Sequence, residues 1–311
     1  MLPREVRTKI YKTGQTRGAD DDVIFQNRVG RNSTVLIPYE EYFMCKDISY
    51  EGGFIVLIKP ESYFEDGKQE ELDKLGLKLG QNLLVFYETR KQWDDFPFLE
   101  GWSVANSRTA PLGGEYVARV PKTTASGSSK IILGYSDTTC KGAGIRVYEY
   151  SSKQNINDCK LQLEVLFWRC YDSLDFIESL GSSRDSVLAY VKNLERIAKD
   201  RGLLDCKQLQ AERILDSEGF TICPLCLERI SARIFCKRIE QAEGRSVPDL
   251  TVTEVSLFHI NELRVGQFNH RPYNLGWGHH HCNVVVKDSG IEKTLKWMEG
   301  VLDRNAKLGY I

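Results

Sequence analysis

Short apolar runs recur through the first half of the chain, and each is bounded by glycine, proline or polar residues. Runs of this length are typical of β-strands, whereas helices need longer apolar patterns. The runs lie at residues 34–37, 54–58, 83–87, 116–120, 131–133 and 145–148. We therefore expect residues 1–160 to form a β-rich domain built on a mostly antiparallel sheet.

The apolar spacing becomes helical after residue 160. Apolar side chains recur at positions 163, 167, 170 and 174, and a second set occupies positions 187, 190, 191, 194 and 197. This spacing places apolar side chains on one face of a helix. A shorter helix is expected at 207–218, and a final amphipathic helix carries apolar positions 291, 295, 298 and 302. The sequence thus predicts an α+β protein with a helical connector at 161–220 and a C-terminal domain at 221–311.

Composition argues against a membrane or secreted protein. No stretch approaches the roughly eighteen consecutive apolar residues of a membrane helix. The charged first residues are followed by no apolar run of the kind that makes a signal peptide. The nine cysteines are an odd number, which suits reduced thiols better than a disulfide framework. We expect a cytoplasmic protein.

The charge balance gives no overall attraction for nucleic acid. The formal net charge of the 311 residues is −1, so any DNA-binding face must come from local clustering of basic side chains. The first segment interleaves basic and aromatic residues, which could meet phosphates and bases. The candidate DNA-binding residues are Lys12, Arg17, Arg28, Arg31 and Lys287. A solvated loop region leading into a sheet explains the first four equally well.

All five histidines fall between residues 259 and 281, which marks this stretch as the place for chemistry. Within it and just before it lie two close pairs of soft ligands. Cys223 and Cys226 form one x-x pair, and His279 and Cys282 form the other. Two such pairs suit a closed tetrahedral zinc site that joins segments far apart in the sequence. We predict a structural zinc ion bound by these four residues.

Three further residues complete a recognisable pattern. His259 lies in a short apolar strand, Asn274 stands just before a leucine, and Asn283 directly follows Cys282. Together with the zinc pairs, this stretch from 223 to 288 resembles the HNH nucleases, also called ββα-metal or His-Me finger enzymes. In that family a β-hairpin carries the histidine and a following helix closes over one divalent cation.

The resemblance implies a role for each residue. His259 would be the general base that activates water for attack on a phosphodiester. Asn274 would hold the hairpin and orient the imidazole, and Asn283 would be a ligand of the catalytic cation, Mg²⁺ or another divalent ion. The family usually has Asp before the base, where this chain has Phe258. The missing ligand would come from Glu254, Glu262, Asp288, His281 or a carbonyl group.

A chain of this size with a large non-catalytic portion looks like a Type II restriction endonuclease of the HNH class. It would cut double-stranded DNA at a specific sequence, with residues 1–160 as the recognition domain and 221–311 as the nuclease domain. Cutting both strands of a palindromic site calls for a homodimer, since one HNH site handles one strand.

Three alternatives stay open. A modification-dependent HNH endonuclease would hold a flipped base in an aromatic cage, using residues such as Trp93, Trp102 or Tyr116. A non-catalytic DNA-binding protein would use the zinc site for structure only. A nuclease of the PD-(D/E)xK type would place its site at 61–68, where Glu61 precedes an Asp-Gly-Lys motif.

Overall fold

A computed structural model describes residues 2–17, 28–87, 89–97, 99–102, 116–118, 144–239, 253–287 and 289–311. The chain forms two compact units. Unit 1 comprises Met1–Gly14, Lys153–Arg264 and Asn269–Ile311. Unit 2 comprises Gln15–Ser152 and Val265–Phe268, so four residues from late in the chain belong to the earlier unit.

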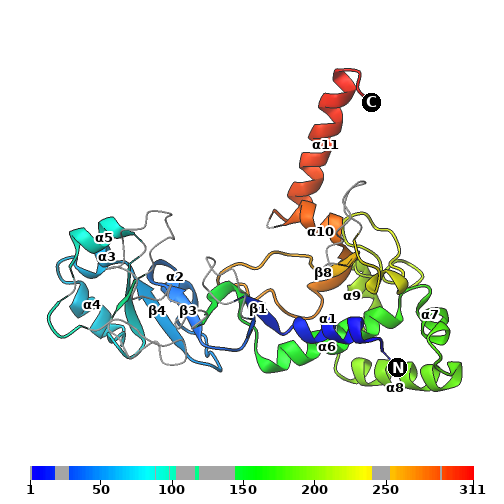
Figure 1. The fold of residues 1–311 in the computed structure, drawn as a ribbon, viewed down its shortest axis with the longest axis horizontal. Coiled ribbons are helices and arrows are strands. Elements are labelled where there is room, and N and C mark those ends of the chain that lie inside the picture. The colour runs from blue at the N-terminus through cyan, green and yellow to red at the C-terminus, as the bar shows by residue number, and fades with distance from the viewer. Residues whose placement is uncertain are drawn as a thin grey trace. The chain divides into compact units, whose positions relative to one another are not determined.

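Unit 2 is built on a five-stranded sheet in the order β6-β5-β4-β3-β7. Figure 1 labels the adjacent strands β3 and β4 of this sheet. Its strands are β3 (Val35–Pro38), β4 (Phe54–Ile58), β5 (Leu83–Tyr87), β6 (Tyr116–Ala118) and β7 (Ile145–Arg146). The helices are α2 (Tyr39–Cys45), α3 (Pro60–Tyr63), α4 (Lys68–Lys74) and α5 (Arg90–Asp95), with a 3₁₀ turn, η3, at Val147–Glu149. A separate antiparallel pair joins β1 (Gln15–Arg17) to β2 (Arg28–Gly30).

The expectation of a mostly antiparallel sheet was wrong, because all four strand pairs of the large sheet are parallel. The strands themselves were well placed, and β4 and β5 have the bounds read from the sequence. Parallel strands are covered on both faces and therefore read as continuous apolar runs, which is how β4 and β5 read. The run at 131–133 lies outside the described residues.

Short helices and turns connect the parallel strands, as parallel pairing requires. α2 lies between β3 and β4, α3 and α4 lie between β4 and β5, and α5 follows β5. The core of unit 2 combines aliphatic residues of the sheet with aromatic residues of the connections. Its members include Val35, Ile37, Val56, Ile58, Val85, Ile145, Tyr42, Tyr50, Tyr63 and Tyr150.

Unit 1 is mainly helical and carries one hairpin. Its longer helices are α1 (Arg4–Lys12), α6 (Lys153–Trp168), α8 (Arg184–Asp200) and α11 (Ile291–Lys307). The shorter elements are α7 (Ser173–Ser179), α9 (Cys206–Ala211), the 3₁₀ turn η4 (Arg233–Phe235), β8 (Val255–His259), β9 (Leu275–His279) and α10 (His280–Val286). Helices lie in each region expected after residue 160, but two of them differ from the expectation. The first starts earlier and is divided into α6 and α7 at residues 169–172, and α9 ends at Ala211 instead of continuing to 218. None of the described helices combines the length and apolar character needed to cross a membrane.

The hairpin of β8 and β9 packs on α6 through a buried aromatic group. Trp277 on β9 is fully buried, and its Nε1 donates a hydrogen bond of 2.9 Å to the carbonyl oxygen of Leu163 on α6. The Trp277 ring meets Phe235 edge to face at 5.0 Å, and Phe235 meets Phe167 in the same way at 5.2 Å. These edge-to-face contacts and the hydrogen bond fix the hairpin against the helical core of unit 1.

Candidate functional site

Two strands and a short helix carry most of the predicted site residues. β8 and β9 pair antiparallel, with Val255 opposite His279 at one end and His259 opposite Leu275 at the loop end. α10 starts directly after β9, at His280. The order strand, strand, helix puts His259 and His279 at opposite ends of the hairpin. The predicted base, His259, is therefore separate from the predicted zinc site, which includes His279.

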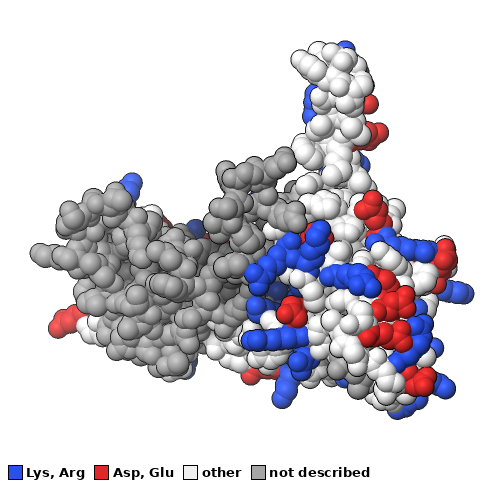
Figure 2. Space-filling model, turned by 45° about the vertical axis from the view of Figure 1, so that its right-hand side comes forward, with Lys and Arg blue, Asp and Glu red and all other residues white. Residues whose placement is uncertain are grey.

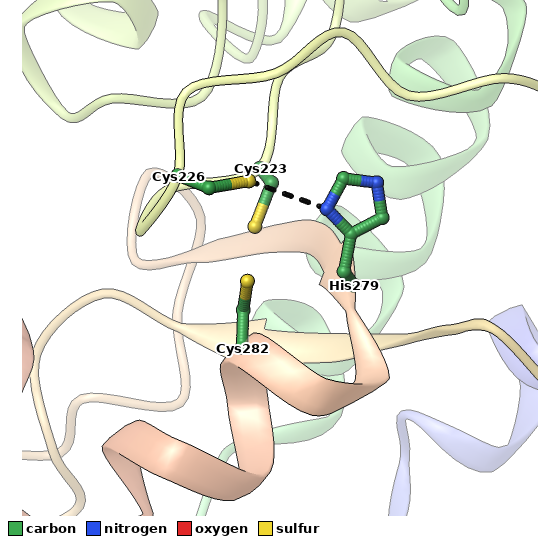
Figure 3. Close-up of side chains that lie close together, drawn as sticks. All are labelled: Cys223, Cys226, His279 and Cys282. Atoms are coloured by element: carbon green, nitrogen blue, oxygen red, sulfur yellow. Dashed lines mark hydrogen bonds between the residues drawn. The ribbon is translucent and has the colours of Figure 1, made fainter. Parts of the chain in front are cut away.

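Four predicted zinc ligands come together at the α10 end of the hairpin (Figure 3). One ligand atom from each of Cys223, Cys226, His279 and Cys282 lies within 4.8 Å of the others. The first two cysteines lie in a tight turn, where the Leu227 N–H donates to the Cys223 carbonyl at 2.9 Å. Figure 3 shows all four side chains directed toward a common centre, with His279 coming from the end of β9 and Cys282 from α10.

The donor chemistry of this cluster fits zinc. Tetrahedral zinc with Zn–S bonds of about 2.3 Å separates its sulfur ligands by roughly 3.8 Å, which agrees with the compactness of the group. Burial raises the pKa of Cys223, but hydrogen bonds from His279 and backbone N–H groups outweigh it and lower that pKa to about 6. Burial raises the pKa of Cys226, whose Sγ lies 3.3 Å from Nδ1 of His279. Three thiols and one imidazole form a soft donor set without water ligands, as in structural zinc sites.

His259 ends β8 and is half-buried. Its Nε2 lies 3.2 Å from Nδ1 of His270, so the two imidazoles share a hydrogen bond. His270 is fully buried, although nothing in the residue pattern separates it from an exposed histidine. Only its position within the histidine-rich stretch could have marked it. The candidate base thus has a buried imidazole partner that sequence reasoning missed.

Asn274 is buried and organises the loop between the two strands. Its Oδ1 accepts the N–H of Asn261 at 2.7 Å. Its Nδ2 donates to the carbonyl oxygens of Asn261 at 2.8 Å and Asn269 at 2.6 Å. One side chain therefore joins both arms of the loop.

Phe258 is fully buried, on the face of β8 opposite to His259. A Cβ built on Gly278 of the neighbouring strand would lie 2.6 Å from the Phe258 ring. The glycine therefore makes room for the phenylalanine, and the pair forms part of the apolar face of the hairpin. Because a buried phenyl ring cannot bind a metal, any second protein ligand for a catalytic cation must lie elsewhere.

The structure places the alternative ligands as follows. Glu254 forms an ion pair with Lys237 at 2.7 Å, and Glu262 pairs with Arg264 at 2.6 Å. The ring of His281 stacks on His279 with centroids 5.4 Å apart. Asp288 lies outside the described residues. Across the described chain, the Cys/His cluster is the one group of three or more His, Cys, Asp or Glu side chains close enough to hold a metal.

Asn283, the predicted cation ligand, lies in the middle of α10 and is half-buried. Its carbonyl accepts the N–H of Lys287 at 3.0 Å, and Lys287 ends the helix with a positive φ of 43°. The Lys287 side chain is exposed. Asn283 thus lies at the centre of α10 and Lys287 directly after its last residue.

The predicted DNA-binding residues of the first segment have different surroundings. Lys12 is exposed at the end of α1. Arg31 is 7% exposed, and its Nη1 donates to the carbonyl oxygen of Glu149 at 3.1 Å. Arg17 pairs with Arg28 in the β1–β2 ladder, and both side chains lie outside the described residues. In Figure 2 basic and acidic side chains are mixed over the visible face of unit 1.

The residues of the alternative sites are also placed. Trp102 packs edge to face on Tyr63 at 5.4 Å in the core of unit 2. The side chains of Trp93 and Tyr116 lie outside the described residues. Lys68, the lysine of the Asp-Gly-Lys motif, pairs with Glu71 at 2.8 Å and Glu65 at 3.3 Å. Both of these lysine contacts stay within or next to α4.

Comparison with known proteins identifies the family to which the chain belongs. No curated protein matches the chain. Among solved structures, a crystal structure of a type II restriction endonuclease is 17% identical and superposes with a TM-score of 0.32. That match covers 51% of this chain and 55% of the solved chain, so this chain spans about half the length of the relative. A model of the family described as BstXI restriction endonuclease matches residues 8–280, which include both strands of the hairpin and most of the chain before it. On the strength of that match, the chain belongs to the BstXI restriction endonuclease family.

Proposed function

We propose that the protein is a sequence-specific endonuclease that cuts double-stranded DNA, as a Type II restriction enzyme. The observation that carries this proposal is the family match, because it extends over residues 8–280 and so includes unit 2 as well as His259 and Asn274. A restriction enzyme needs a part that selects a sequence and a part that breaks a phosphodiester. Unit 2 and the hairpin region of unit 1 are proposed for these two tasks.

In the proposed mechanism, His259 takes a proton from a water molecule that attacks the phosphorus atom of the backbone. The position of the imidazole at the end of β8, held by the loop that Asn274 joins, supports this role. A general base contributes about 10² to 10⁴ in rate. The reaction adds water across the phosphodiester, and the leaving oxygen is released from phosphorus.

Two kinds of metal are proposed for this family member. The cluster of Cys223, Cys226, His279 and Cys282 would hold a structural zinc ion that fixes the start of α10. Asn283 on α10 would be a ligand of a catalytic Mg²⁺ or similar ion. Such an ion, when bound, neutralises charge on the phosphate. The buried Phe258 leaves the rest of that ion's ligands to water, the phosphate and other protein groups.

Recognition of the DNA is proposed for unit 2, with Arg17, Arg28 and Arg31 as candidate contacts. Lys12 and Lys287 are proposed as phosphate contacts from unit 1. A homodimer with two-fold symmetry would present one hairpin to each strand of a symmetric site. Because Arg31 is buried, a contact from its side chain to DNA would require its neighbours to move. Lys12 and Lys287 are exposed and would reach a phosphate without such a movement.

Incubation of the wild-type protein and His259→Ala with long unmethylated DNA and Mg²⁺ tests the proposal. Discrete fragments are expected from the wild type, and the variant should cut about 10² to 10⁴ times more slowly. Zinc content and the unfolding temperature serve as controls and should be alike in both proteins. If this DNA is not cut, the same incubation is repeated with methylated and hydroxymethylated DNA. Failure on all of these, with tight DNA binding retained, would favour a non-catalytic DNA-binding protein.

A further inference from the structure

His270 lies directly against the proposed base and has no exposed surface. Its relative exposure is 0%, and its ring centroid is 5.4 Å from that of His259. The short contact joins Nδ1 of His270 to Nε2 of His259 at 3.2 Å. Two imidazole nitrogens at this distance form one hydrogen bond, in which one ring donates and the other accepts.

The backbone that carries His270 is fixed on its N-terminal side. The carbonyl oxygen of Asn269 accepts from Nδ2 of Asn274 at 2.6 Å and from the N–H of Arg271 at 3.0 Å. The Asn269 side chain donates to the carbonyl oxygen of Glu262 at 2.6 Å. A buried ring on a loop with these links has little freedom to turn. Its Nδ1 is therefore a fixed partner for the half-buried His259.

The direction of the shared hydrogen bond decides what His259 can do. If Nε2 of His259 carries the hydrogen and donates it, then Nδ1 of His259 holds the lone pair that a base needs. If Nδ1 of His270 donates instead, the lone pair of His259 is on Nε2, where it accepts the hydrogen bond from His270 and cannot take a proton from water. Only the first arrangement is compatible with water activation by Nδ1. The same logic makes an acceptor behind a catalytic histidine select its tautomer.

We propose that His270 is a positioning residue that accepts a hydrogen bond from Nε2 of His259 and so keeps Nδ1 of His259 as the basic nitrogen. This inference rests on the proposed function of His259 as a base. It also explains how Asn274 can orient the imidazole. Asn274 binds the carbonyl oxygen of Asn269, the residue next to His270, and His270 then meets His259.

The hydrogen bond is tested without any measurement of cleavage. The chain has five histidines, so protein labelled with ¹⁵N in histidine gives few ring signals, and His259→Ala identifies those of residue 259. Spectra at about pH 8 are above the ordinary imidazole pKa of about 6.5 and show which nitrogen of each neutral ring carries the proton. We expect a proton on Nε2 of His259 and a through-bond nitrogen coupling from it to His270. A proton on Nδ1 of His259, or no coupling, would overturn the proposal.

Two variants test the consequence for catalysis. His270→Phe keeps a buried ring without the acceptor, and His270→Asn offers Oδ1 near the position of Nδ1. We expect His270→Phe to mix the His259 tautomers and to lower kcat about 10- to 100-fold with little change in KM, as loss of an orienting partner does elsewhere. His270→Asn should recover part of both. Unchanged tautomers and unchanged kcat in a folded His270→Phe would refute the positioning role.

Ser173→Ala is the matched control, because Ser173 is 2% exposed and its hydroxyl donates to the carbonyl oxygen of Trp168 on α6, not to a residue of the hairpin or its loop. It should lower the unfolding temperature without altering the His259 signals or kcat. If His270→Phe does not fold, the coupling in the wild type decides alone. If the wild type cuts no DNA, the proposed nuclease function fails while the spectra still decide which way the hydrogen bond runs.

Discussion

The large sheet of unit 2 and the hairpin of unit 1 are stabilised in different ways. The sheet has five strands and buries a continuous set of aliphatic residues. The hairpin has two strands, and a two-stranded ribbon alone is marginally stable in water. It is held instead by the buried Trp277, by the side chain of Asn274 and by the Cys/His cluster. The region proposed for chemistry thus depends on a few specific links, whereas the sheet depends on total buried area.

Removal of the proposed zinc ion should have the largest effect, and that effect should be confined to β8, β9 and α10. Structural zinc contributes about 10 to 16 kcal/mol of binding free energy in small metal-dependent domains, although the rest of unit 1 will reduce the loss of folding here. We expect a strong chelator, or Cys223→Ser, to abolish hydrogen-exchange protection in β8, β9 and α10. Protection in β3, β4 and β5 should persist. Cys236→Ser is the control, since Cys236 lies outside the cluster and should leave zinc content unchanged. Simultaneous loss of protection in both regions would contradict the comparison.

Truncation of the sheet core should give the opposite pattern. Ile58 on β4 is fully buried, so Ile58→Ala should lower the free energy of unfolding of unit 2 by about 2 to 5 kcal/mol. Chemical denaturation and hydrogen exchange measure the loss, while zinc content should not change. Leu57→Ala, on the same strand but half-buried, should cost less. Equal losses from the two variants would mean that burial does not set the stability of this sheet.

The loop of the hairpin should be sensitive to loss of one amide. Asn274→Ala removes the side-chain partner of the Asn261 N–H and of the Asn261 carbonyl, while the Asn269 carbonyl keeps the N–H of Arg271. The variant should cost about 2 to 4 kcal/mol, since each unsatisfied buried group costs about 1 to 3. Asn274→Asp keeps the acceptor for the Asn261 N–H and should cost less. Thermal unfolding and exchange at residues 260–274 measure both. If hydrogen-exchange protection is lost only in unit 2, Asn274 does not stabilise the hairpin loop.

The smallest effect is expected from Lys9, whose Nζ donates to the carbonyl oxygen of Val255 at the start of β8. Burial lowers the pKa of Lys9 from 10.5 to about 8. Between these two values the unfolded chain binds more protons than the folded chain, so stability contributed by this group rises with pH from about 8 to 10.5. The gain should be about 1 to 3 kcal/mol and should be missing in Lys9→Met. The difference between the two unfolding curves across this pH range is the measurement, and parallel curves would contradict it.

Local features were predictable where one physical signal dominates. β4 and β5 were placed correctly because each is a run of apolar residues closed by polar or turn residues. The predicted proximity of the four Cys and His side chains was confirmed, because close pairs of soft ligands have few other uses. The pairing direction of the sheet was missed, since antiparallel and parallel partners are chosen by connections longer than any local pattern. The continuous apolar character of β4 and β5 was the available sign.

The partner of the base could not be predicted from its neighbours in the sequence. His270 stands among Asn269, Arg271 and Pro272, which read as an exposed turn. Its burial comes from the return of the loop onto β8, and that return depends on the hydrogen bonds of Asn274. Asn274 was identified by resemblance, but the contacts through which it acts required the structure. The surroundings of Arg31 were not predicted either. This basic residue lies in a basic and aromatic segment, yet its side chain is buried and donates to the carbonyl oxygen of Glu149.

The segment Val265–Phe268 interrupts the loop that joins β8 to β9, yet it belongs to unit 2. Val265 and Phe268 pack on the core of unit 2, where Phe268 meets Tyr150 edge to face at 6.1 Å. A gene fusion that exchanges only residues 15–152 for those of a relative would leave these two side chains against a foreign core. Unit 2 therefore cannot be exchanged between relatives as one continuous block without disturbing its core. An exchange that preserves the core must also replace Val265–Phe268, the four residues that the loop between β8 and β9 contributes to unit 2.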